Sequence, residues 1–248
     1  QIIQSGVALG GGLNIERYSD ILSILMMQNG AEMLSDSGQV LFASTPSAYR
    51  EQKFSPGLEA LQFYCDFANP AKEVYCWNAQ MDDSLKMFSE GRLAMMFGYS
   101  YHLPTIKAQA PKLNFAVAKL PQIEGNSQLL NYANYWVETV SAKSKYANEA
   151  WDFAQFAAKA EQVKTYLDKT KKPTALRSLV AEQIDDMDIG IFAEQVLTAK
   201  SWYKGADSAA MEQIFGEMID ATVAGQQKLE DIIELGARKI QQTIVGGN

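Results

Sequence analysis

The sequence predicts a globular protein that mixes helices with strands, of the α/β or the α+β class. Of its 248 residues, 47% are hydrophobic, which allows a sizeable core and excludes wholesale disorder. Short apolar runs, typical of buried strands, occur between residues 93 and 140. From residue 148 onward, apolar residues recur mainly at helical spacing.

The first elements are marked by their end signals. Residues 2–9 are apolar and end at the three glycines 10–12, where we expect a flexible loop. Residues 18–29 predict a mostly buried helix that stops at Gly30. A turn is expected at residues 35–38.

Two further helices follow. Ser55 and Pro56 have the residue types of an N-cap and a first helical position. A short helix is expected over residues 82–90, with Leu85 and Phe88 facing inward. The expected buried side of the helix that starts at Pro56 consists of Leu58, Leu61, Phe63, Tyr64 and Phe67.

The middle of the chain predicts three strands and one helix. Residues 93–97 and 114–120 are short apolar runs, typical of strands, and the first of them is expected to be buried. Residues 99–110 indicate a helix in spite of Pro104. Residues 132–140 alternate between two faces and predict the third strand.

The remainder of the chain is predicted to be helical from residue 148 to its end. Gly225 separates two amphipathic helices. Trp151 lies in an amphipathic pattern and is assigned to packing. The expected buried positions of the two helices are Met211, Ile214, Phe215, Met218, Ile219 and Val223, then Leu229, Ile232, Ile233, Ala237 and Ile240.

Charge and hydropathy exclude several classes of protein. The formal net charge is −7, which argues against general nucleic-acid binding, because that relies on Lys and Arg at phosphates. The longest apolar runs, residues 21–27 and 93–97, are too short to cross a bilayer. Residue 1 is Gln and no leader follows, so we expect the chain to be a piece of a longer protein.

Few residues are suited to catalysis or metal binding. His102 is the single histidine, and no GxSxG motif accompanies it, so a Ser-His-Asp triad is disfavoured. The His and Cys ligands of a zinc site are too few, and we expect no metal and no cofactor. Cys65 and Cys76 fit either two buried thiols or one disulfide in an oxidising compartment.

Short motifs in a fixed order identify a family. Residues 28–33 (QNGAEM) end a helix, and residues 88–95 (FSEGRLAM) precede an aromatic turn at 98–101. Further motifs lie at residues 120–121, 141–145, 149–153, 173–178 and 224–225. Together they resemble family 1 of the extracellular solute-binding proteins, the maltose-binding-like components of ABC sugar importers.

The resemblance implies a type II periplasmic-binding-protein fold, in which two α/β lobes hold a sugar between them. It matches the later portion of that plan. Residues 1–118 and 174–248 would build the second, C-terminal lobe, and residues 119–173 would cross back to the first lobe. We expect this crossover segment to be mobile, swapped, or packed differently from the family.

Candidate binding residues are aromatic and amide side chains, because sugars stack on aromatic faces and bond polar tips. Tyr99 and Tyr101 follow the motif strand at the turn where the family holds its ligand. Trp202 is expected to be exposed because Lys200, Ser201 and Lys204 surround it. The full set is Trp77, Asn78, Tyr99, Tyr101, Asn134, Tyr135, Trp136 and Trp202.

Other motifs favour ordinary structural roles. The glycines 10–12 lack the Gly-Lys-Ser/Thr of a phosphate loop. The acidic residues 185–188 lack EF-hand spacing and are better explained as a solvated helix start than as a calcium site. The lysines of 169–172 favour a solvated loop over an anion site, and His102 favours a surface or satisfied position over a ligand contact.

The resemblance predicts a binding protein outside the cytoplasmic membrane, periplasmic or lipid-anchored, that delivers a carbohydrate to permease subunits of an ABC transporter. Two alternatives stay open. One is a truncated interaction domain that binds no ligand. The other is a carbohydrate-active enzyme that uses two carboxylates, although no Asp or Glu lies in a recognisable catalytic motif.

Overall fold

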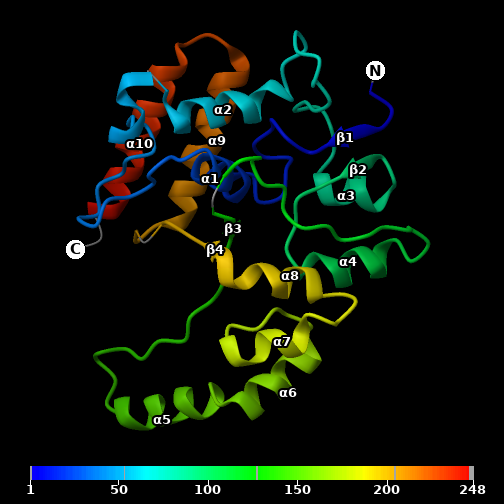
Figure 1. Cartoon of the computed structure of the whole chain (residues 1–248), viewed down its shortest axis with the longest axis vertical. Coiled ribbons are helices and arrows are strands. Elements are labelled where there is room, and N and C mark those ends of the chain that lie inside the picture. Colours follow the sequence, from blue (N-terminus) through cyan, green and yellow to red (C-terminus); the bar gives the residue numbers. More distant parts are fainter. Residues whose placement is uncertain (1, 53, 127, 204, 246–248) are drawn as a thin grey trace.

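Two short parallel strand pairs tie together distant parts of the chain (Figure 1). The computed structural model describes residues 2–52, 54–126, 128–203 and 205–245. Strand β1 (Ser5–Val7) pairs with β2 (Leu93–Met95), and β3 (Asn131–Tyr132) pairs with β4 (Ala199–Lys200). Because parallel neighbours need crossover connections, these pairs set the mixed helix-and-strand architecture that the sequence predicts.

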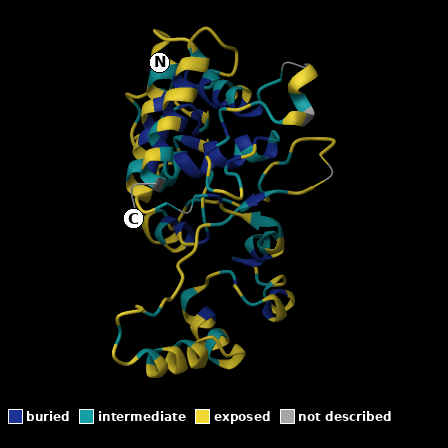
Figure 2. Ribbon diagram, turned by 90° about the vertical axis from the view of Figure 1, so that its left-hand side faces the viewer, coloured by how far each residue is buried: buried dark blue, intermediate teal, exposed yellow. Residues whose placement is uncertain are grey.

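The core lies among four helices: α1 (Tyr18–Gln28), α2 (Pro56–Asp66), α9 (Ser208–Ala224) and α10 (Leu229–Val245). They form the upper part of the molecule, where buried residues are concentrated (Figure 2). Phe215 of α9 is fully buried and packs edge-on against Phe42. The largest buried side chains here include Trp77, Tyr64, Phe42, Phe215, Leu22, Met26, Leu61, Ile219, Ile233 and Ile240.

Glycines end two of these helices, as the sequence predicts. Gly30 follows α1 with φ 97°, and Gly225 follows α9 with φ 65°. Both values lie in the left-handed region that glycine adopts at helix ends. At Gly30 a Cβ atom would also lie 2.8 Å from the hydroxyl of Tyr49, so this end has no room for a side chain.

Smaller helices flank β2. Asp83 caps α3 (Ser84–Ser89), because its carboxylate accepts the backbone N–H groups of Leu85 and Lys86. Met87 is the buried apolar residue of α3, whereas Leu85 and Phe88, the predicted inward residues, are half-buried. Helix α4 (His102–Gln109) follows the aromatic turn, with Pro104 in its first turn. A 3-10 helix covers Ser47–Gln52.

The lower part of the molecule consists of short helices: α5 (Ala147–Ala157), α6 (Ala160–Thr170), α7 (Val180–Gln183) and α8 (Gly190–Gln195). The lowest of them, α5 and α6, are mostly exposed (Figure 2). None of the described residues of α5 is buried, and Leu167 is the buried residue of α6. Two 3-10 helices, Arg177–Leu179 and Val196–Thr198, complete this part.

Two predicted strands are wrong in whole or in large part. Residues 114–120 join no strand among the residues that the structure describes. The strand predicted over residues 132–140 is reduced to β3, and the residues after Tyr132 are mainly exposed. A strand forms only where a neighbour supplies hydrogen bonds. The strand at residues 93–97 is shorter than predicted and only partly buried, with Met95 60% exposed.

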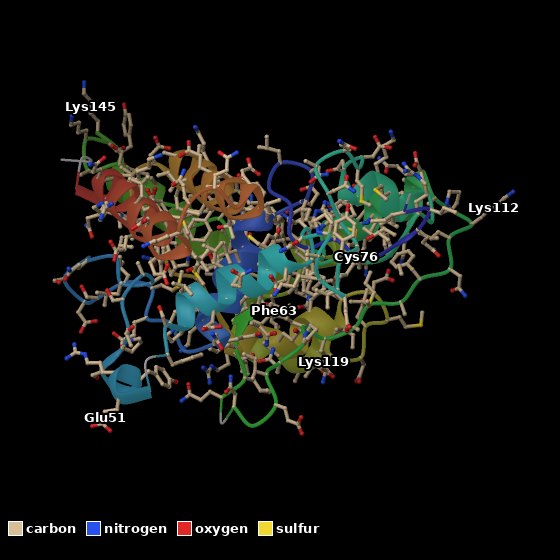
Figure 3. All side chains as sticks on the ribbon, turned by 90° about the horizontal axis from the view of Figure 1, so that it is seen from above. Glu51, Phe63, Cys76, Lys112, Lys119 and Lys145 are labelled. Carbon is tan, nitrogen blue, oxygen red and sulfur yellow. The ribbon has the colours of Figure 1, made fainter. Side chains whose placement is uncertain are left out.

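Several burial predictions also need correction. Phe63 points outward from α2 and is half-exposed (Figure 3). Trp151 is half-exposed on α5 and does not pack in a core. Trp202, predicted to be exposed, is buried. Cys65 and Cys76 are free thiols, so the disulfide alternative is wrong, and Cys65 is the buried one. No described helix is long and apolar enough to cross a membrane.

Candidate ligand-binding site

Arg17 lies at the centre of a charged cluster at the start of α1. Its Nε atom donates to Asp20 Oδ2 at 2.9 Å, and a terminal nitrogen pairs with Glu212 Oε1 of α9 at 3.0 Å. Burial alone would lower the pKa of Arg17, but the hydrogen bond to Asp20 and the nearby charges outweigh it and raise the pKa. Arg17 therefore stays charged and ties the starts of α1 and α9 together.

The backbone of Arg17 is strained. Its φ of 58° and ψ of 32° place it in the left-handed region, which non-glycine residues rarely adopt. Such conformations persist where the surroundings enforce them, and they concentrate at functional sites. Here the two ion pairs hold the side chain while α1 begins at the next residue.

The aromatic turn after β2 lies against this cluster. The hydroxyl of Tyr99 donates to Asp20 Oδ2 at 2.7 Å. Burial and the Asp20 carboxylate raise the pKa of Tyr99, so its hydroxyl keeps its proton. The ring of Tyr101 stacks on that of Tyr99, with centroids 5.6 Å apart and planes 22° apart, and stays 45% exposed. The pair thus offers an accessible aromatic face beside fixed charges.

Glu16 and His102 form the other edge of the cluster. The Nδ1 atom of His102 accepts the backbone N–H of Tyr99 at 2.9 Å, and its ring lies 4.3 Å from that of Tyr101. Burial lowers the pKa of His102. The pKa of Glu16 is raised by burial and by Asp83, with Arg17 acting in the opposite direction.

Two of the three predicted tryptophans, Trp77 and Trp202, are buried among core residues. Trp77 is fully buried, and its Nε1 donates to Asn14 Oδ1 at 3.1 Å. Trp202 packs against Phe42 and Phe215, and its Nε1 donates to Ser23 at 3.0 Å. Neither ring offers a free face to a ligand in this structure.

The other predicted residues are divided between two places. The Nδ2 atom of Asn78 donates to the hydroxyl of Tyr75 at 3.1 Å, within the loop beside Trp77. Asn134, Tyr135 and Trp136 follow β3 on the exposed segment that leads to α5, and Trp136 is 96% exposed. Of the predicted set, the structure brings only Tyr99 and Tyr101 together with the charged cluster.

A groove and an acidic segment lie elsewhere on the surface. Asp186 accepts the N–H groups of Asp188 and Ile189, and both aspartates pair with lysines, as expected for an acidic turn. Among the described residues, no group of three His, Cys, Asp or Glu side chains is arranged to hold a metal ion. An open groove of about 370 Å³ between α9 and α10 is lined by Ala210, Gln213, Ile214, Glu217, Lys239, Gln242 and Thr243.

Comparison with protein families gives a match over residues 15–190, to the bacterial extracellular solute-binding proteins. The chain belongs to this family. A comparison with curated proteins gave no match.

Solved structures show the same fold for this solute-binding protein. A cyclic α-maltosyl-1,6-maltose binding protein from Arthrobacter globiformis has a TM-score of 0.71 at 18% identity, over 98% of this chain and 60% of that one. The maltotriose binding protein of Thermus thermophilus, bound with maltotriose, has a TM-score of 0.63 at 17% identity, over 98% of this chain and 62% of that one. An ABC transporter solute binding protein from Thermotoga lettingae, bound with α-D-tagatose, has a TM-score of 0.69 at 18% identity, over 97% of this chain and 60% of that one.

These likenesses establish the type II periplasmic-binding-protein fold that the sequence motifs predict. The chain spans about 60% of the length of the solved structures that it matches. It therefore corresponds to part of that fold.

Within this solute-binding protein, the sequence pointed to the aromatic half of the cluster and missed the charged half. Arg17 and Asp20 have the three-residue spacing of a helical ion pair, a signal available from the sequence. Glu212 has no such local signal, because only the packing of α9 on α1 brings it to Arg17. The cluster combines donors, acceptors and an aromatic face, as polyhydroxylated ligands require.

Proposed function

We propose that this protein is the carbohydrate-binding component of an ABC importer, which captures a sugar or oligosaccharide and delivers it to a membrane permease. The observation that carries the proposal is the exposed, stacked Tyr101 ring beside the cluster of Arg17, Asp20 and Glu212. Aromatic faces cover the apolar side of a pyranose, and charged groups held in place bond its hydroxyls.

The fold supports the proposal without fixing the sugar. The three solved structures compared above are 17–18% identical to this chain, so they support the fold, and the sugar is identified by measurement. Residues that recognise the sugar are proposed to be Tyr99 and Tyr101 from the turn. Asn134, Tyr135 and Trp136 remain candidates on the exposed segment, whereas the burial of Trp77 and Trp202 favours a role in packing.

The division into lobes is part of the same proposal. Residues 1–118 and 174–248 form the second lobe, and residues 119–173 return to the first. The exposed apolar side chains of this segment support this, since exposed clusters of this kind mark surfaces that another part covers. Trp136 is 96% exposed, Phe153 71% and Tyr146 70%.

The family supports the proposed location and partners. An extracellular solute-binding protein works outside the cytoplasmic membrane, and we propose that this one lies in the periplasm or is held by a lipid anchor. Closure of the two lobes on the sugar would shift a conformational equilibrium, and the permease subunits would bind the closed form. The ligand is bound and released without any chemical change.

Titration calorimetry with maltotriose, α-D-tagatose and a panel of other saccharides tests the proposal. We expect binding without turnover, and a loss of affinity of about tenfold or more in Tyr101→Ala, because one stacked ring and its buried area are removed. Tyr146→Ala, which removes an equally large exposed ring on the lower part, is the matched control and should bind as the unchanged chain does.

Three outcomes would contradict the proposal. Hydrolysis of a glycosidic substrate would indicate an enzyme. If none of the tested saccharides bound, the chain would be better explained as an interaction domain that binds no sugar. Equal loss of affinity in Tyr101→Ala and Tyr146→Ala would show that the aromatic turn is not the site.

A further inference from the structure

The proton on the imidazole of His102 is fixed by the backbone. The N–H of Tyr99 donates to Nδ1 at 2.9 Å, so Nδ1 must carry a lone pair. In the neutral ring the proton then lies on Nε2. Burial, together with the charge of Arg17, lowers the pKa of His102. The backbone contact with Tyr99 and the charge of Asp83 act in the opposite direction, and the net shift favours the neutral ring.

The position of the ring is fixed as well. The side chain of His102 is 6% exposed and lies at the first residue of α4. A Cβ atom at Gly98 would lie 3.0 Å from Nδ1, so the glycine leaves the space that the ring occupies. The Nε2–H group therefore points in one fixed direction.

The Glu16 carboxylate lies near this N–H group, but too far away for a direct hydrogen bond. His102 Nε2 and Glu16 Oε2 are 3.9 Å apart, which is too far for a hydrogen bond. Among the residues that the structure describes, no side chain or backbone group accepts from Nε2 or donates to the Glu16 carboxylate. The Glu16 side chain is 37% exposed, so a polar group from outside the protein can enter this gap and bridge the two atoms.

A single hydroxyl group fits the gap. An oxygen about 2.8 Å from both atoms accepts from Nε2–H and donates its own proton to the carboxylate. A group that can only accept a hydrogen bond would pair with Nε2–H but would face the negative carboxylate of Glu16 with no proton to donate. A group that can only donate would pair with Glu16 but would leave Nε2–H without an acceptor. The ring of Tyr101, 4.3 Å from the imidazole and 45% exposed, lies alongside.

We propose that Glu16 and His102 form a subsite for one hydroxyl group of the ligand, with His102 as donor and Glu16 as acceptor, beside the Tyr101 ring. The inference rests on the proposed function and specifies it: the ligand presents a free hydroxyl next to an apolar face. This selects uncharged polyhydroxylated compounds over carboxylates and phosphates, which Glu16 repels.

Nitrogen NMR of the chain labelled with ¹⁵N-histidine tests the donor directly, because the single histidine makes the assignment unambiguous. We expect a neutral ring at pH 7 with its proton on Nε2. A proton on Nδ1, or a charged ring at pH 7, would overturn the subsite whether or not any sugar binds.

Maltotriose, titrated into the same sample and followed by calorimetry, tests the pair. His102→Asn keeps an acceptor for the Tyr99 N–H but removes the Nε2 donor, and we expect its affinity to fall about tenfold. His102→Gln, which restores a donor near the Nε2 position, should recover part of the loss. Glu16→Ala should weaken binding at least as much as His102→Asn, whereas Glu230→Gln, a change at the exposed start of α10, should not.

The outcomes separate the two proposals. Binding of maltotriose with unchanged His102 signals, or with undiminished affinity in both His102→Asn and Glu16→Ala, overturns the subsite and leaves the proposed function standing. Failure of maltotriose and of every other saccharide to bind overturns the proposed function, and the subsite with it. Thermal unfolding of each variant shows whether a loss reflects the site or the fold.

Discussion

The helices of the core and the helices of the lower part differ in what they pack against. Helices α9 and α10 have regular apolar stripes and bury most of their residues, with Phe215 and Ile219 of α9 and Ile240 of α10 at 0% exposure. Val223, predicted to be buried at the end of α9, is 44% exposed. Helix α5 is as clearly amphipathic in sequence, yet it leaves Phe153 71% exposed. The pattern of a helix therefore predicts which side needs a partner, and not whether the chain provides one.

The difference has energetic consequences. Burying one large apolar side chain contributes about 1.5–3 kcal/mol, and isolated helices of about 11 residues are marginal in water. Helices α5 and α6 have 11 residues each and few buried contacts. Their stability must come from whatever covers them, which we propose to be the rest of the first lobe.

The largest expected contrast is in amide hydrogen exchange. Amides of α1 and α9 should exchange only through global unfolding, because both helices lie in the core. Amides of residues 146–170 should exchange through local opening, with opening free energies far below the free energy of global unfolding. Hydrogen exchange measured by mass spectrometry tests this difference. Equal protection in both regions would contradict the claim that the lower helices lack a packing partner.

A pair of phenylalanine substitutions gives the next effect. Phe215→Ala removes a fully buried ring that packs against Phe42 and Trp202, and we expect it to lower the free energy of unfolding by about 3–5 kcal/mol. Phe153→Ala removes an exposed ring on α5 and should change it by less than about 0.5 kcal/mol. Urea unfolding of the two variants measures both values. A large loss in Phe153→Ala would mean that this face is covered in solution.

Alkaline conditions should weaken the core specifically. Burial raises the pKa of the Cys65 thiol to about 12, from a usual value near 9. Below pH 9 the thiol is protonated in both states, and above it the unfolded chain ionises first. Its contribution to stability is therefore lost as the pH rises from 9 toward 12, with a loss on the order of 1 kcal/mol by pH 10.

Urea unfolding at several pH values tests this. Cys65→Ala should lower the stability at neutral pH through the lost packing, but its stability should fall less steeply above pH 9. Cys76→Ala provides the control for loss of the other thiol. An unchanged slope in Cys65→Ala would contradict the proposed origin of the alkaline effect.

The smallest effect on stability is expected from the ion pair that joins α6 and α7. Lys164 pairs with Glu182, and both side chains are at least half-exposed. Exposed ion pairs contribute little because water and salt screen them. Lys164→Met should therefore leave the urea midpoint unchanged, and a clear shift would mean that this pair holds the lower helices in place.

The helices were predictable from the sequence, since their information is local. Apolar spacing located α9 and α10, and Gly30 and Gly225 marked helix ends. The strands were less predictable, because a strand forms only when a partner distant in sequence pairs with it, and local sequence does not identify that partner. Residues 133–140 have the alternation of a strand, but only Asn131 and Tyr132 find a partner, in β4.

The site was half predictable for a similar reason. The aromatic turn at Tyr99 and Tyr101 belongs to a short motif, whereas Glu212 reaches Arg17 only through tertiary packing. Trp202 shows the limit of arguing from neighbours. In an extended segment adjacent side chains point to opposite sides, so the exposed residue Ser201 does not predict the exposure of Trp202.

The central claim is that the Tyr99–Tyr101 turn and the cluster around Arg17 form the ligand-binding surface of this solute-binding protein. Titration of the ¹⁵N-labelled chain with maltotriose, followed by backbone amide shifts, tests it most directly. We predict that the largest shifts fall on residues 16–20, 99–102 and 212. Shifts confined to the groove between α9 and α10 or to α5, or no shifts at saturating sugar, would contradict the claim.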